Sequence, residues 1–214
     1  MRMLIATGAI LLCALATLAE GGVLLSSLQR SLVLDSQIQN QLPQPGIAMA
    51  KAGDDHLVIR WSLNTTLQQT QADVDAIYNK VNLKLCYTPV SQTNRGWRKT
   101  NDNLTKDKSC GKAIVTQKYV DAAGNSTVWR IPKDVPGAVY FVRAYVLNAN
   151  GTQIAYGQTT NANRTTNLIA IEPISGRHAS IDVAAAIFSA FSIGSLLFFL
   201  VLESMKTMKS GSSK

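Results

Sequence analysis

The residues best suited to chemistry in this sequence lie in one basic stretch between two cysteines, Cys86 and Cys110. Residues 95–112 hold six cations against Asp102 and Asp107. A basic cluster can bind nucleic acid, anionic lipid or an acidic protein surface. Trp97 between two arginines favours a protein partner, because Trp and Arg are enriched at interface hot spots; a solvated loop is the alternative. The candidate contact residues are Arg95, Trp97, Arg98, Lys99, Lys106, Asp107 and Lys108.

Catalytic chemistry has little support in the sequence. There are two histidines, His56 and His178, and neither has a nucleophile or carboxylate at a suggestive spacing. We find no P-loop, dinucleotide or metal-ligand motif. The sequence therefore predicts a protein that is not an enzyme and that carries no cofactor or metal.

Both ends of the chain indicate a membrane protein. Residues 183–202 are uncharged and mostly apolar, and a helix of that length crosses the hydrocarbon core once, at about 1.5 Å per residue. Residues 1–19 have the pattern of a cleaved signal peptide, with an uncleaved anchor as the alternative. Lys206, Lys209 and Lys214 in the tail, residues 203–214, place the C-terminus in the cytoplasm and the N-terminus outside the cell.

Two further features fit a secreted ectodomain. Cys13 leaves with the signal peptide, so Cys86 and Cys110 can pair only with each other within the chain, and in an oxidising compartment we expect that disulfide. Sequons for N-glycosylation require surface positions. The chain has five of them, at Asn64, Asn103, Asn125, Asn150 and Asn163.

Alternating hydrophobicity predicts an all-β ectodomain. Residues 20–52 read as a partly ordered lead-in, 53–174 as an immunoglobulin or fibronectin III-like β-sandwich and 175–182 as a juxtamembrane segment. A short helix is possible over 71–78. Trp61 is the expected core plug, and Cys86 faces away from the core, so its disulfide would attach a loop to the outside of a sheet. The predicted strands are 56–63, 80–87, 113–120, 127–131, 139–147, 154–159 and 167–171.

Several short motifs resemble the plant family of high-affinity nitrate transport accessory proteins. They are Lys84-Leu-Cys-Tyr87, Trp97-Arg-Lys-Thr100, Lys106-Asp-Lys108 with Cys110, Tyr140-Phe-Val-Arg-Ala-Tyr145, Ala155-Tyr-Gly-Gln158 and Ile174-Ser-Gly-Arg-His-Ala-Ser180. The resemblance runs from about residue 45 to the apolar segment. It implies a plasma-membrane subunit that binds, stabilises and activates a polytopic nitrate transporter and conducts nothing itself, since one helix cannot provide alternating access.

The resemblance makes the basic stretch the expected contact with the transporter. Arg98 and Asp107 would be its charged contacts, desolvated on assembly, although each could instead belong to an intramolecular ion pair that shapes the loop. A second candidate is the small-residue stripe Ala186, Ala190 and Gly194 in the apolar segment, which suits self-association, docking or plain anchoring equally well. The competing function is a glycosylated cell-surface co-receptor or adhesion protein, against which the short tail argues.

Overall fold

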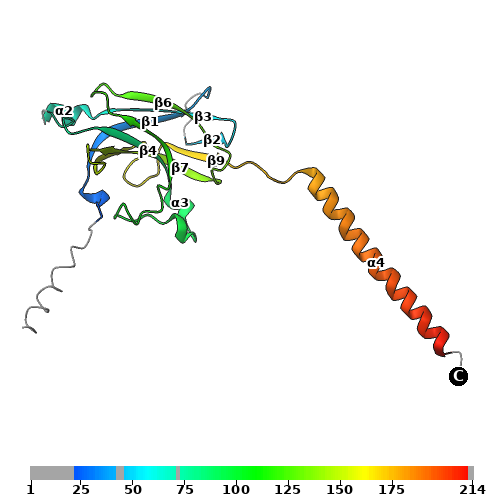
Figure 1. Ribbon diagram of the computed structural model, residues 1–214. Helices are drawn as coiled ribbons and strands as arrows, with labels where there is room; N and C mark the ends of the chain where they lie inside the picture. The colour runs from blue at the N-terminus through cyan, green and yellow to red at the C-terminus, as the bar shows by residue number, and fades with distance from the viewer. Residues whose placement is uncertain (1–21, 42–45, 71–72, 212–214) are drawn as a thin grey trace, which may run out of the picture. The chain divides into compact units, whose positions relative to one another are not determined.

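The computed structural model describes residues 22–41, 46–70 and 73–211 of the chain (Figure 1). The predicted signal peptide lies outside these residues. The chain divides after Pro173 into two compact units, and the first carries all of the strands.

One layer of the β-sandwich is built around β3 (His56–Leu63), which pairs antiparallel with β1 (Gln29–Ile38) and with β6 (Asn125–Arg130). Side chains alternate along β3, so that Leu57, Ile59 and Trp61 point into the core and are at most 4% exposed. Trp61 therefore occupies the core position that the sequence predicts. Figure 1 shows these three strands side by side.

The other layer is centred on β7 (Ala138–Leu147). It pairs antiparallel with β4 (Lys80–Tyr87), β8 (Gln153–Gln158) and β9 (Leu168–Glu172). Beyond these, β5 (Lys112–Lys118) pairs with β4, and β2 (Ile47–Lys51) pairs in parallel with β9. The inner face of this second layer contributes Leu83, Leu85 and Val142 to the core. All seven strands expected from the sequence are present, within two residues at each end.

The predicted lead-in over 20–52 is wrong, because it contains β1 and β2. The first residues of β1 pair in parallel with β8 and the later ones pair antiparallel with β3, so β1 joins the two layers. The register shifts between Arg30 and Leu32, and the neighbouring residues Ser31 and Leu32 are both buried. This irregularity removes the strict alternation by which a strand is recognised in sequence.

The helix proposed for residues 71–78 does not form over residues 73–78; residues 71 and 72 lie outside the described part of the chain. Residues 73–77 form turns, while a helix, α2 (Thr65–Thr70), precedes them. The side-chain Oδ1 of Asn64 accepts the Thr66 N–H at 3.1 Å and so satisfies one of the free amides at the start of α2.

The second unit contains a single long helix, α4 (Ala179–Gly211). Residues 179–206 of this helix are long and apolar enough to cross a membrane. The predicted span over 183–202 lies inside it. The fold is thus an immunoglobulin-like β-sandwich followed by one apolar helix.

Candidate docking site

The basic stretch forms a closed loop over residues 87–109, which we call the stapled loop. Cys86, the second-to-last residue of β4, forms a disulfide with Cys110, as the sequence leads us to expect. Beside it the Tyr87 N–H donates to the Ser109 carbonyl at 2.9 Å, so the two ends of the loop lie together. The loop contains two short helices, α3 (Pro89–Gln92) and η3 (Gly96–Arg98).

The disulfide lies on the outer face of β7, as the alternation along β4 predicts. Cys86, Cys110 and Phe141 form a small buried cluster apart from the main core, with Leu168 packed against it. Ser91 holds α3 to the start of β7, because its hydroxyl accepts the Val139 N–H at 2.8 Å. The loop is therefore a packed part of the sandwich.

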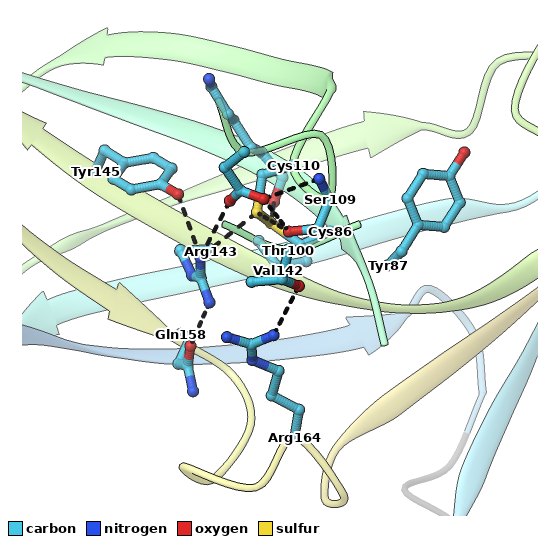
Figure 2. The surroundings of a disulfide bond; sticks show 12 residues. Cys86, Tyr87, Thr100, Ser109, Cys110, Val142, Arg143, Tyr145, Gln158 and Arg164 are labelled. Carbon is cyan, nitrogen blue, oxygen red and sulfur yellow. Dashed lines mark hydrogen bonds and ion pairs between the residues drawn. A yellow bond between two sulfur atoms is a disulfide. The ribbon is translucent and has the colours of Figure 1, made fainter. Parts of the chain in front are cut away.

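A buried arginine lies beneath the loop (Figure 2). Arg143 of β7 is 1% exposed. Its Nη2 donates to Gln158 Oε1 at 3.1 Å, and its Nη1 donates to the Tyr145 hydroxyl at 3.3 Å and lies 3.6 Å from Cys110 Sγ. Its ionic partner is Asp107, with Nη1 and Oδ2 3.9 Å apart.

The Asp107 carboxylate ties two parts of the loop together. Its side chain is 3% exposed. Oδ1 accepts the Ser109 hydroxyl at 2.7 Å and the Ser109 N–H at 2.9 Å, and it also accepts the Asn101 N–H at 3.3 Å. The other oxygen, Oδ2, has no hydrogen bond within the described residues and faces Arg143.

A second arginine, Arg164, approaches the loop from the segment between β8 and β9. Its Nη1 donates to the Thr100 hydroxyl at 2.9 Å, as Figure 2 shows. Burial lowers the pKa of Arg164, and the positive charge of Arg143 lowers it further. Two cations and one carboxylate therefore share this buried region.

Arg98 is buried in a different way. It is 8% exposed, and its guanidinium stacks on the Tyr87 ring at 4.3 Å from the centroid; Tyr87 in turn packs on Tyr140. The Nε and Nη1 atoms of Arg98 have no hydrogen-bond partner among the described residues. Arg98 is thus an arginine with spare donors just below the surface.

Five of the seven candidate contact residues are exposed and form what we call the basic rim: Arg95, Trp97, Lys99, Lys106 and Lys108. Trp97 is 66% exposed, next to the buried Arg98. Lys99 and Lys108 are neighbours, because the Lys108 N–H donates to the Lys99 carbonyl at 3.2 Å. The expectation that Arg98 and Asp107 lose their water on assembly does not hold, since both are already buried in the isolated chain.

The first described residues also contact the stapled loop. Residues 22–28, the N-terminal strap, include the short helix η2 (Leu25–Ser27). The strap forms a bridge between Leu24 and Asn103, and Ser26 donates its N–H and its hydroxyl to the Asp102 carboxylate at 2.8 and 2.6 Å. These hydrogen bonds lower the pKa of Asp102. This contact was not predicted from the sequence.

Sequence reasoning also missed Arg143, Gln158 and Arg164. The one available signal is the position of Arg143: its two neighbours Val142 and Ala144 are buried core residues, so Arg143 lies on the opposite face of β7, beside Cys86. The predicted sequons lie at strand ends and in loops; Asn125, Asn150 and Asn163 are exposed, and Asn64 and Asn103 are partly so.

The described residues thus combine an immunoglobulin-like sandwich that carries a stapled, basic outer loop with one helix that is long and apolar enough to cross a membrane. Residues 25–176 match the family model described as high-affinity nitrate transporter accessory, Ig-like domain. The chain therefore belongs to the family of high-affinity nitrate transporter accessory proteins.

Relatives from two plants agree with this assignment. The chain is 43% identical over 191 residues to a probable high-affinity nitrate transporter-activating protein 2.2 of Oryza sativa subsp. japonica, covering 89% of this chain and 85% of the relative. It is 40% identical over 178 residues to the Arabidopsis thaliana protein named high-affinity nitrate transporter 3.2, covering 81% and 84%. A further Arabidopsis relative, named high-affinity nitrate transporter 3.1, is 43% identical over 162 residues, covering 76% and 74%.

Proposed function

We propose that this chain is a non-catalytic accessory subunit that binds, stabilises and activates a polytopic high-affinity nitrate transporter at the plasma membrane. Its signal peptide is removed, its sandwich is glycosylated outside the cell and α4 crosses the membrane once. Family membership and the names of the relatives support the accessory role. The described residues contain one helix that could cross a membrane, which supports the need for a partner, because one helix cannot itself provide alternating access to nitrate.

The observation that carries the docking part of the proposal is the basic rim on a loop whose backbone is fixed. Trp97 is two-thirds exposed although it is a large apolar side chain, and cations flank it. A rigid aromatic residue among cations suits an acidic protein surface, because the ring gives contact area and the cations steer the encounter. The disulfide and the contacts with β7 keep the loop ordered before binding, which lowers the entropic cost of assembly.

Arg98 contributes to this surface from below. Stacked on Tyr87, it keeps its donors in place beside Trp97, and a carboxylate of the transporter could take up the donors that have no partner in the chain. Asp107 has a different position, because its oxygens are directed toward the loop backbone and toward Arg143.

The test is nitrate uptake in a heterologous cell that lacks its own high-affinity system. We expect no saturable uptake from this chain alone and low uptake from a plant nitrate transporter expressed alone. When both are expressed together, nitrate uptake and the surface abundance of the transporter should increase. Saturable uptake from this chain alone would contradict the proposal. So would uptake by the transporter that is unchanged by this chain.

A further inference from the structure

Arg143 is an unusual residue for a buried position in the middle of β7. It is almost fully buried, although arginine is rarely buried without a compensating charge. On β7 the inner-face residues Val142 and Ala144 belong to the main core, while Arg143 lies on the outer face, where it pairs in register with Lys84 of β4 and Gln158 of β8. The position is therefore enclosed by the stapled loop rather than by the opposite layer.

The hydrogen bonds of Arg143 fix the direction of its guanidinium. Gln158 accepts from Nη2, and the Gln158 amide is itself held by the carbonyls of Thr160 and Asn161. The Tyr145 hydroxyl accepts from Nη1. With these partners the guanidinium is directed from β7 toward Asp107 and the disulfide, as Figure 2 shows for the labelled residues.

Asp107 links the Arg143 guanidinium to the stapled loop. One of its oxygens faces Arg143, and the other accepts hydrogen bonds from residues 101 and 109, on the two sides of the loop segment that contains Lys106 and Lys108. Loss of the carboxylate charge would leave the buried Arg143 beside the half-buried Arg164 without a counter-ion, which is strongly unfavourable. The loop segment would then have to move so that water could reach the cations.

We propose that Arg143 is a positioning residue for the docking loop: Arg143 and Asp107 together hold the stapled loop in the conformation that presents the basic rim. Asp107 then acts on partner binding through Arg143 and does not touch the transporter. This inference rests on the proposed function for its link to the transporter. The part that concerns the loop itself stands on the contacts within this chain.

A double-mutant cycle on the full-length chain separates the two roles of Asp107. The variants are Asp107→Asn, Arg143→Gln and the double substitution, and the measurement is the affinity for the nitrate transporter that the wild-type chain activates, in detergent. We expect each single variant to bind at least about 100-fold more weakly, because each leaves one buried charge unpaired. The double variant should bind no more weakly than either single variant, because the two fully buried charges are removed together and only the half-buried Arg164 keeps its charge.

Additive losses in the double variant would overturn the inference, because they would mean that Asp107 and Arg143 act independently. The matched control is the exposed pair Asp35→Asn and Arg60→Gln, whose charged atoms lie 3.8 Å apart with more than half of each side chain exposed. This pair should leave transporter affinity unchanged. A milder variant, Tyr145→Phe, removes one acceptor of Arg143 and should weaken binding by about threefold to tenfold.

A second measurement needs no partner. Hydrogen exchange of the full-length chain in detergent should be faster in residues 95–109 of both single variants, while the amides of β3 keep their protection. Unchanged exchange in the loop would overturn the positioning role. If exchange changes as expected but the wild-type chain binds and activates no nitrate transporter, the proposed function fails and the role of Arg143 in the loop stands.

Discussion

Removal of the disulfide should have a large and calculable effect on the first unit. Cys86 and Cys110 are 24 residues apart in sequence. On the chain-entropy model, closing a loop of that length removes conformational entropy from the unfolded chain and raises its free energy by about 3.5 kcal/mol. The change to make is Cys86→Ala together with Cys110→Ala, because a single substitution leaves a free thiol. The free energy of unfolding should fall by about that amount.

The assay is urea unfolding of the full-length chain in detergent, followed by tryptophan fluorescence. The chain has three tryptophans, Trp61, Trp97 and Trp129, and all of them lie in the first unit. The signal therefore reports the sandwich and is silent on α4. Linear extrapolation of the transition gives the free energy in water.

The control is Val90→Ala, a substitution in the same loop at a side chain that is 76% exposed, and it should change stability by no more than about 0.5 kcal/mol. A loss below about 1 kcal/mol in the double cysteine variant would refute the reasoning. It would mean that the loop is held by its contacts with β7 and that the disulfide does not constrain the unfolded chain appreciably.

Three further changes test other parts of the structure. Trp97→Ala should weaken transporter binding by about 30-fold or more, as expected for a hot-spot residue, with unchanged stability; co-purification at the wild-type level would remove the basic rim from the interface. Gly157→Ala should destabilise the sandwich by about 1 to 3 kcal/mol in the urea assay, because an added Cβ would clash with the Leu32 carbonyl oxygen. An unchanged midpoint would show that β1 and β8 can separate at no cost. The hydrogen bonds from Ser26 lower the pKa of Asp102, so they stabilise the strap above the unfolded pKa of about 3.8, and this stability is lost as the pH falls through the lower folded pKa. Hydrogen exchange at Leu25, corrected for the intrinsic rate, should therefore be constant from pH 7 to 5 and faster below about pH 4. Ser26→Ala should reduce this pH dependence.

Much of the fold follows from local patterns in the sequence. The predicted bounds of β3 and β4 agree with the structure because one face of each strand is buried and the other is not. The strand β1 escaped prediction because it pairs with two different strands through an irregular register. Ser31 and Leu32 are both buried, and the apolar Val33 that follows them is exposed, so hydrophobicity does not alternate along its first half. That information is tertiary and is absent from a local pattern.

The site was predicted in outline and not in its internal structure. Charge and composition singled out the stapled loop, and its closure was predicted because Cys86 and Cys110 are the two cysteines that remain after the signal peptide. Nothing local distinguishes Asp107, which is buried, from Asp102, which is exposed, because the difference arises from Arg143, which lies 36 residues further along the chain than Asp107. The same holds for Arg98 and Arg95, since burial depends on the Tyr87 ring that only one of them reaches.

The contact between the N-terminal strap and Asp102 bears on how this protein is labelled. Ser26 lies 76 residues before Asp102 in sequence but directly beside it in the fold. An epitope or fluorescent protein fused directly before Gly22 would therefore sit next to the loop that is to be tested for binding. Gly22 has little free space there, because an added Cβ would clash with the Asn103 side chain. Comparison of transporter binding by the tagged and the untagged chain would measure how closely the transporter approaches the N-terminal strap.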